Sequence, residues 1–223
     1  EGAYREVPKG TIHLLCVDSE LTPENKHIVI KYEDSFFIGA DNGVFSLIFK
    51  DIIPEEIFEI NLHSSFNYKI SSDDLFVKVI GHILRSGPLN VVGTKINKIK
   101  EITNLRPTVN KEQNQIIGSV IYIDNYGNVI TNITEKLFKE ISKTRSFTIN
   151  ARNVKFTKIY KNYSDAIDFS LNREEREEDG KKMAIFNSLG YLQLSIYKSN
   201  PQTVGSASTL FGLNYRDPVS IYF

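Results

Sequence analysis

The feature that most constrains this chain is the run VIYIDNYGNVITNI, from Val120 to Ile133. Apolar and polar side chains alternate along both halves of the run, which is typical of half-buried strands. Asp124, Asn125, Gly127 and Asn128 stand between the halves, and Asn and Gly supply the positive-φ positions that tight turns require. The run therefore predicts a β-hairpin with polar groups at its tip.

Length and charge limit the classes of protein to which the chain can belong. Its 223 residues exceed the usual size of one domain, so we expect one large or two small domains with a real core. Lys plus Arg equals Asp plus Glu at 27 each, which gives no electrostatic support for a nucleic-acid or anionic-membrane partner. No stretch approaches the roughly 18 apolar residues of a membrane span, and nothing at the start resembles a signal peptide.

The first part of the chain, residues 1–106, combines apolar strands with one helix. A single apolar stripe predicts the helix over residues 75–84, with Ser71 or Ser72 as its N-cap. Gly87 is expected to end the helix in the left-handed conformation that glycine adopts readily.

Cysteine and histidine usage argues against several kinds of site. The single cysteine, Cys16, lies in an apolar run, which excludes a disulfide within one chain and predicts a buried, inert thiol. The histidines are widely spaced and no HExxH or Cys/His cluster is present, so we predict no metal site. Walker, GxGxxG and GxSxG motifs are also missing from the sequence, which leaves kinases and classical dinucleotide enzymes without support.

A polar segment, residues 107–116, is predicted to link two domains. Beyond it, residues 117–223 show β-rich alternation, interrupted by a short helix from about Thr134 to Lys143. The pattern thus changes from strands with a helix to a mainly β-structured region.

Four stretches agree in order and spacing with one known family. They are the hairpin run, GTIHLLCVDSE from Gly10, FIGADNGVFS from Phe37, and FNSLGYLQLSIYKSN from Phe186 with FGLNYRDPV from Phe211. Together they resemble the S-adenosylmethionine hydroxide adenosyltransferases, which are related to the fluorinating and chlorinating enzymes that act on the same substrate. Four ordered matches over nearly the whole chain are far more specific than any one of them.

The resemblance implies an architecture and an assembly. The expected fold is an α/β N-terminal domain with a central sheet, followed by a smaller, mainly antiparallel β-barrel-like domain. Members of the family form homotrimers in which the substrate lies between the first domain of one subunit and the second domain of its neighbour. A homotrimer with intersubunit sites is therefore expected, and the composition fits a cytoplasmic protein.

The resemblance also implies a substrate, S-adenosylmethionine, and no cofactor. Methionine leaves the 5′ carbon as a neutral group, so the protein must mainly bind the cation and align a nucleophile behind that carbon. Attacking water must also be relieved of a proton. Asp124 suits cation binding, because a carboxylate beside the ammonium or sulfonium offsets the cost of burying charge. The alternative role for Asp124 is an Asx turn that caps the hairpin.

Other substrate contacts carry over residue by residue from the resemblance. Asn128 falls where the family presents an amide to the substrate, and Tyr126 occupies an aromatic position. Tyr163 matches an aromatic that stacks on adenine, with surface packing as the alternative. Ser188 matches a residue that holds the methionine carboxylate, and Asn200 lies near the backbone that meets the adenine edge. Ordinary turn and strand-end roles are the alternative for these residues.

The catalytic positions depart from the family pattern. Family hydrolases place an Asp, an Arg and a His around the attacking water. Asp18 matches the aspartate at the end of an apolar strand, and Ser71 takes the histidine position. Asn25 takes the arginine position if residues 28–30 keep register with the family strand, and Lys26 or His27 supplies a positive charge only if the loop follows another path. Ser72 stands beside Ser71, and this pair suits hydrogen bonding to an anion at a helix N-terminus.

The family's opening segment is a strand and a Gly-rich loop with an aspartate that grips the ribose hydroxyls, and it has no counterpart here. A parallel sheet without its first strand would expose a long apolar edge. We therefore expect this sequence to be part of a longer protein.

The resulting hypothesis is hydrolysis of S-adenosylmethionine to adenosine and methionine, with Asp18 orienting or polarising water. The replacements at Asn25 and Ser71 motivate a second hypothesis, a protein that binds S-adenosylmethionine or a nucleoside without turnover. A halide-using adenosyltransferase, with the Ser71–Ser72 pair at the anion, is the third.

Overall fold

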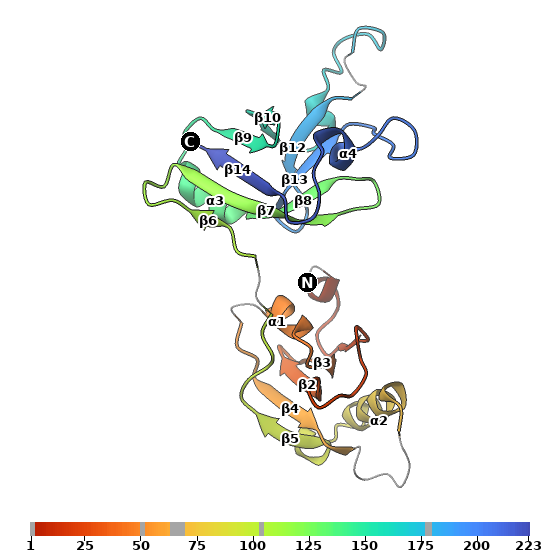
Figure 1. Cartoon of the computed structure of the whole chain (residues 1–223). Coiled ribbons are helices and arrows are strands. Elements are labelled where there is room, and N and C mark those ends of the chain that lie inside the picture. Colours follow the sequence, from red (N-terminus) through yellow and green to blue (C-terminus); the bar gives the residue numbers. More distant parts are fainter. Residues whose placement is uncertain (1–2, 50–51, 63–69, 103–104, 177–179) are drawn as a thin grey trace. The chain divides into compact units, whose positions relative to one another are not determined.

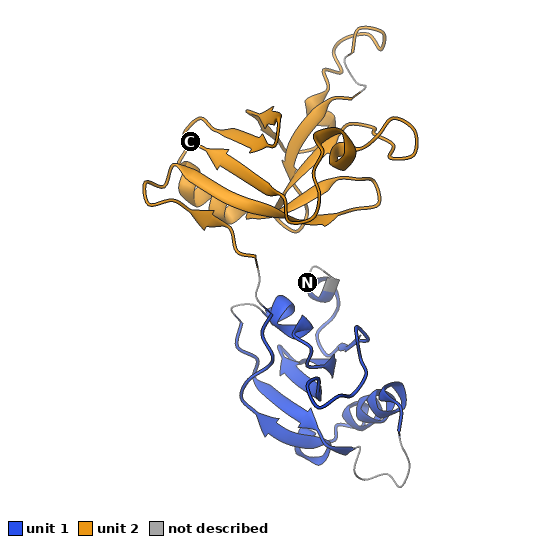
Figure 2. Cartoon of the chain, in the orientation of Figure 1, with its two compact units in different colours: residues 1–104 blue, residues 105–223 orange. Residues whose placement is uncertain are grey.

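The computed structural model describes residues 3–49, 52–62, 70–102, 105–176 and 180–223. The chain forms two compact units, residues 1–104 and 105–223 (Figure 1, Figure 2), and sheets dominate both. The segment 107–116, which was predicted to link the domains, contains β6 (Thr108–Val109) and the first residues of β7 (Gln115–Ile123). These two strands pair with each other inside unit 2.

Unit 1 has a five-stranded sheet in the order β1-β3-β2-β4-β5. Its strands are β1 (Ile12–Leu15), β2 (His27–Tyr32), β3 (Ser35–Ala40), β4 (Glu56–Ile60) and β5 (Gly93–Ile96). Within the described residues of unit 1, only the β1–β3 pair is parallel, so the sheet is mixed and the expectation of a parallel sheet is wrong. The local reason is the turn at Glu33 and Asp34, whose φ values of 48° and 64° suit a two-residue hairpin between antiparallel strands.

Two helices cover the opposite faces of this sheet. Successive residues of a strand point to opposite faces, so Val29 of β2 packs in one core cluster while Ile28 and Ile30 pack in the other. The first cluster contains the buried side of α2 (Ser72–Leu84), and the second contains that of α1 (Val44–Phe49). The predicted apolar stripe of α2 is mostly buried, but Ile80 is only partly buried and Leu84, at the end of the helix, is 72% exposed.

The ends of α2 confirm one prediction and correct another. Ser71 is the N-cap, and its hydroxyl accepts the backbone N–H of Asp74. The left-handed residue at the C-terminal end is Ser86, with φ 59°, and not Gly87. Gly87 is needed for space instead, because a Cβ there would lie 2.3 Å from the ring of His82.

The first strand of unit 1 has a neighbour on one side only within the described residues. Cys16 directly follows this strand and is exposed, so the prediction of a buried thiol is wrong. The apolar run around Cys16 belongs to an edge strand whose outer residues face solvent, as the 40% exposure of Leu14 also indicates. An apolar run alone does not distinguish an edge strand from a central one.

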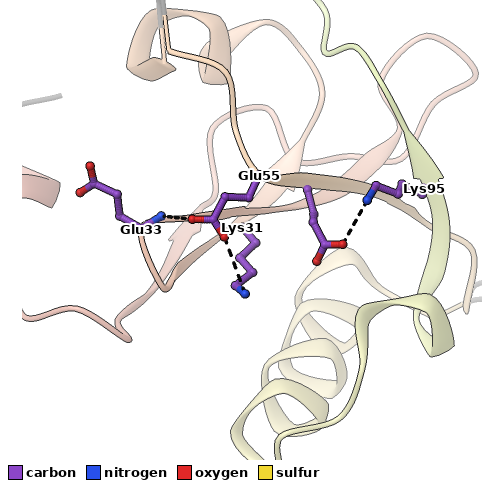
Figure 3. A network of polar contacts seen from close by, with 5 residues as sticks. Lys31, Glu33, Glu55 and Lys95 are labelled. Atoms are coloured by element: carbon purple, nitrogen blue, oxygen red, sulfur yellow. Dashed lines mark hydrogen bonds and ion pairs between the residues drawn. The ribbon is translucent and has the colours of Figure 1, made fainter.

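Charged side chains on neighbouring strands meet where β2 ends (Figure 3). Lys31 forms an ion pair with Glu55 at 3.7 Å, and the same carboxylate accepts the backbone N–H of Glu33 at 3.1 Å. Lys95 of β5 pairs with Glu56 of β4 at 3.1 Å. Such half-exposed pairs contribute at most about 1 kcal/mol each. They therefore add a little stability to a strand register that other interactions determine.

Unit 2 is a nine-stranded, barrel-like sheet in the order β10-β9-β14-β7-β8-β13-β12-β11, with β6 beside β7. The remaining strands are β8 (Val129–Thr134), β9 (Thr148–Ala151), β10 (Val154–Phe156), β11 (Ile159–Tyr160), β12 (Lys182–Phe186), β13 (Tyr191–Ile196) and β14 (Pro218–Tyr222). All pairs except β11–β12 are antiparallel, as predicted. Unit 2 is the longer of the two units, however, and not the smaller.

Both local predictions for unit 2 are confirmed. The hairpin consists of β7 and β8, and the short helix is α3 (Glu135–Ser142). The hydroxyl of Thr134 caps α3 by accepting the N–H of Leu137, and Lys143 ends the helix in the left-handed conformation. Shorter helical segments are α4 (Ala207–Phe211) and the 3-10 turns η1 (Ala3–Glu6), η3 (Leu89–Val91) and η4 (Tyr163–Ala166).

No helix of the described residues has the length and apolar character of a membrane span.

Replacing Thr134 by Ala should lower the free energy of unfolding of unit 2 by about 1 kcal/mol, because the side-chain cap of α3 is lost. Urea denaturation followed by circular dichroism measures this change. Thr203→Ala is the control, because Thr203 is exposed and surface substitutions change stability by at most about 0.5 kcal/mol. Equal stabilities of the two variants would contradict the capping role.

Candidate functional site

Asp18 lies in the turn after β1, and its backbone is held in an unusual conformation. Its φ is 44°, which is uncommon for a residue other than glycine. The side-chain amide of Asn42 donates to the carbonyl of Val17 at 2.6 Å and to that of Asp18 at 3.4 Å. The oxygen of the same amide accepts the N–H of Val44 at the start of α1 at 3.1 Å. Asn42 therefore fixes the turn, and the exposed Asp18 projects from it.

Asn25 belongs to a second turn at the same end of the sheet. Its backbone N–H donates to the hydroxyl of Thr22 at 2.9 Å, and its carbonyl accepts the N–H of Thr22 at 3.3 Å. The ammonium of Lys100 donates to the side-chain oxygen of Asn25 at 3.1 Å. The position that the resemblance assigns to a catalytic arginine thus holds a neutral amide, with a cation bound to it from a distant part of the chain.

Asp41 connects these turns and was not singled out from the sequence. Its carboxylate accepts the backbone N–H of Lys100 at 2.9 Å, and its own N–H donates to the carbonyl of Lys26 at 2.6 Å. Burial raises the pKa of Asp41 above its usual value, while the hydrogen bond and positive charge of Lys100 act in the opposite direction. Asp41 is therefore a structural anchor: its carboxylate holds the segment at Lys100 and its backbone N–H holds the loop before β2.

His27 is a buried residue beside the same loop, with 1% of its surface exposed. Its Nε2–H donates to the carbonyl of Ser19 at 2.9 Å, and its ring lies 4.7 Å from that of Phe76 in α2. Burial lowers the pKa of His27, and the bond to Ser19 partly offsets that shift. Ser19 follows Asp18, so His27 joins the loop with Asp18 to the side of the sheet that α2 covers.

The two serines at the start of α2 have a structural role of their own. The Ser71 hydroxyl donates to the carboxylate of Asp74 at 2.9 Å and accepts the N–H of that residue at 3.2 Å. Ser72 is the first residue of α2 and is partly exposed. The contact between His27 and Phe76 places the first turns of α2 near the Asp18 loop, but within the described residues no hydrogen bond joins Ser71 to Asp18 or Asn25.

In unit 2, the tip of the β7–β8 hairpin uses its polar groups to build the turn. One carboxylate oxygen of Asp124 accepts the N–H groups of Tyr126 and Asn128, both at 2.9 Å. The other oxygen accepts the side-chain amide of Asn128 at 2.9 Å. The Asx-turn role of Asp124 is therefore confirmed. Asn128 is buried, whereas Tyr126 is 72% exposed.

A second cluster of polar side chains in unit 2 lies around Tyr163. The side-chain amide of the buried Gln193 donates to the hydroxyl oxygen of Tyr163 and to the hydroxyl of the buried Ser195, the latter at 2.9 Å. Tyr163 begins the 3-10 turn η4 and is 39% exposed. Its hydroxyl end is thus held from inside the sheet, while part of the residue is exposed to solvent.

Ser188 and Asn200 lie in turns. Ser188 is exposed between β12 and β13, where the side-chain oxygen of Asn187 accepts the N–H groups of Leu189 and Tyr191 at 3.1 Å each. Asn200 forms an isolated bridge with Gly205, and its side-chain oxygen accepts the N–H of Gln202 at 2.9 Å. The structure therefore places four predicted residues, Asp18, Asn25, Ser71 and Ser72, in unit 1 and the other six in unit 2.

Among the described residues, no group of three or more His, Cys, Asp or Glu side chains is arranged to hold a metal ion.

Comparison with known proteins agrees with this two-unit arrangement. The model of the SAM hydroxide adenosyltransferase N-terminal domain matches residues 1–93, and that of the C-terminal domain matches residues 118–220. The chain thus belongs to the SAM hydroxide adenosyltransferase family. One relative is the (R)-S-adenosyl-L-methionine hydrolase of Methanocaldococcus jannaschii, which is 26% identical over 96% of this chain and 72% of the relative.

Two solved structures share the fold. A crystal structure of an uncharacterized conserved protein from Thermotoga maritima has a TM-score of 0.77 and 25% identity, over 99% of this chain and 80% of that one. A conserved hypothetical protein from Thermus thermophilus has a TM-score of 0.66 and 17% identity, over 98% and 77% of the two chains. The likeness to this second structure concerns the fold alone.

Gly127 at the hairpin tip offers a test of how this region is packed. A Cβ at Gly127 would lie 2.1 Å from the hydroxyl oxygen of Ser206, and φ is 72°. Gly190 has a similar φ of 75° but nothing within 4 Å of such a Cβ. Gly127→Ala should therefore destabilise unit 2 by about 1–3 kcal/mol more than Gly190→Ala, because overpacking adds to the shared backbone strain. Thermal unfolding that is equal for both variants would contradict this packing.

The buried His27 should make the stability of unit 1 depend on pH. Since its pKa in the folded protein is lowered, its contribution is fully present above the unfolded value of about 6.5 and is lost as the pH falls below it. We expect the free energy of unfolding to drop more between pH 7 and pH 5 in the wild type than in His27→Gln. A slope in His27→Gln that equals the wild-type slope would refute this role of His27.

Proposed function

We propose that this protein hydrolyses S-adenosylmethionine to adenosine and methionine by in-line attack of water or hydroxide on the 5′ carbon. The observation that carries the proposal is the exposed Asp18 carboxylate at the end of β1, on a turn that Asn42 fixes and next to the loop that holds Asn25. The similarity to the M. jannaschii hydrolase supports the choice of water over other nucleophiles.

The reaction needs alignment and proton removal more than help for the leaving group. The bond from the 5′ carbon to sulfur breaks with its electron pair on sulfur, so methionine departs as a neutral thioether. Asp18 orients the water and accepts its proton. The fixed turn restricts the position of the carboxylate, and such alignment of reacting groups lowers the entropic part of the barrier.

Substrate binding is assigned to the residues of unit 2. The exposed face of Tyr163 suits stacking on adenine, because Gln193 holds the hydroxyl edge of the ring. Asp124 contributes negative charge near the cationic substrate while it shapes the turn that carries Tyr126 and Asn128. Ser188 contacts the methionine carboxylate and Asn200 the adenine edge in this proposal.

The proposal includes a homotrimer with sites between subunits. Each unit carries only part of the predicted set, since the reacting groups belong to unit 1 and the substrate-binding groups to unit 2. A complete site would then combine unit 1 of one subunit with unit 2 of its neighbour. Light scattering in solution should give three times the mass of the chain, and a monomer with full activity would contradict this part.

A second candidate is a protein that binds S-adenosylmethionine or a nucleoside without turnover. The observation in its favour is that the Ser71 hydroxyl is committed to capping α2, with both a donated and an accepted bond to Asp74. Ser71 is therefore a poor substitute for a catalytic histidine. Isothermal titration measures binding of S-adenosylmethionine, and the product assay described next measures turnover. Binding without product would select this second candidate.

The decisive experiment is incubation with S-adenosylmethionine, followed by chromatographic detection of adenosine and methionine. Asp18→Ala should lower kcat by at least about 10²-fold, as expected for loss of a general base. Glu20→Ala removes an exposed carboxylate of the same loop and should leave the rate unchanged. If Asp18→Ala were as active as the wild type, the proposed role of Asp18 would be wrong.

A further inference from the structure

We propose that Lys100 is a positioning residue for the nucleophile, acting through the side-chain amide of Asn25. This inference rests on the proposed hydrolysis and adds a residue that neither the sequence motifs nor the comparisons indicate. It starts from one contact: the Lys100 ammonium donates to the Asn25 side-chain oxygen at 3.1 Å, across 75 positions of sequence.

Both ends of Lys100 are attached to the candidate site. Its backbone N–H donates to the carboxylate of Asp41 at 2.9 Å, next to the residue that fixes the Asp18 turn. Two residues later, the N–H of Ile102 donates to the hydroxyl of Ser46 in α1 at 3.1 Å. The segment is thus held against β3 and α1 while the Lys100 side chain reaches Asn25. The contacts therefore bring together the Asp18 turn, the Asn25 turn and Lys100, three segments far apart in sequence.

This contact determines which end of the Asn25 side-chain amide is free to bind another group. An asparagine side chain has one accepting oxygen and an NH₂ group with two donors. The ammonium binds the oxygen, so the NH₂ group is the end that remains to donate, and it has no hydrogen-bond partner within the described part of the chain. A neutral donor with a positive charge beside it suits an oxygen that gains negative charge during the reaction.

The reaction step assigns a task to each group. The oxygen of water forms a bond to the 5′ carbon as the bond from carbon to sulfur breaks and the electron pair leaves with sulfur. One water proton passes to Asp18, and the Asn25 NH₂ group donates to the developing hydroxide. Lys100 holds the amide in this orientation and lowers the energy of the nearby negative charge. Asn25 and Lys100 together would thus supply the donor and the charge that a single arginine provides at that position in the family pattern.

A purely structural role for Lys100 predicts a different result. Lys100 is exposed, and exposed polar contacts of a lysine add little to stability. Removal of the ammonium should therefore leave the fold and substrate binding intact. Lys98, an exposed lysine two residues earlier in the same segment, provides a matched control.

The experiment compares Lys100→Met, Lys100→Arg, Lys98→Met and the double variant Asn25→Arg/Lys100→Met in the adenosine-release assay. We expect Lys100→Met to lower kcat by about 10²-fold, the usual effect of removing one electrostatic stabiliser, with KM changed less than about threefold. Lys100→Arg should keep most of the activity, and Lys98→Met all of it. The double variant should regain at least about tenfold over Lys100→Met, because the charge returns on the neighbouring side chain.

The outcomes distinguish this inference from the proposed function. Adenosine release by the wild type together with unchanged kcat in Lys100→Met would overturn the role of Lys100 and leave the hydrolase assignment standing. A loss of activity that neither Lys100→Arg nor the double variant restores would also overturn it, since that loss would reflect local structure and not charge. A wild type that binds S-adenosylmethionine but releases no adenosine would overturn both proposals.

Discussion

The hydrogen bonds of Asp41 and Asn42 are the interaction on which the arrangement of unit 1 depends. Both residues directly follow β3, the strand that pairs with β1 on one side and β2 on the other. Asn42 binds the turn after β1, and Asp41 binds the backbone before β2 and the segment after β5. A parallel or mixed sheet brings loops together at a strand end without fixing them. Here two adjacent residues, through their side chains and the backbone N–H of Asp41, hold three loops in place.

Burial makes these contacts strong enough to matter. A buried polar group that lacks a hydrogen bond costs roughly 1–3 kcal/mol, so the partly buried Asp41 carboxylate gives its partners a defined position. Unit 2 applies the same principle at the hairpin tip, where both oxygens of Asp124 bind the turn. In both units, a carboxylate shapes a loop through the hydrogen bonds that it accepts.

Local features of the fold were predictable from the sequence. Periodicity and capping residues located α2, α3 and the β7–β8 hairpin, because these elements depend on neighbours a few residues away. The sequence does not show that β1 lies at the edge of its sheet. For this reason Cys16 was predicted to be buried, whereas it is exposed. The left-handed residue after α2 was predicted one position too late. Gly87 is needed because a larger residue would clash with the His82 ring, and its φ angle is not positive. The contact between Lys100 and Asn25 joins residues 75 positions apart, and no local pattern carries that information.

The exposed thiol has a practical consequence. Cys16 is the only cysteine of the sequence, and it stands on the surface two residues before Asp18. A maleimide dye or spin label would therefore attach at a single point of each chain without any engineered substitution. Because that point adjoins the turn fixed by Asn42, the label would report through its fluorescence or line shape when a ligand orders or displaces this loop.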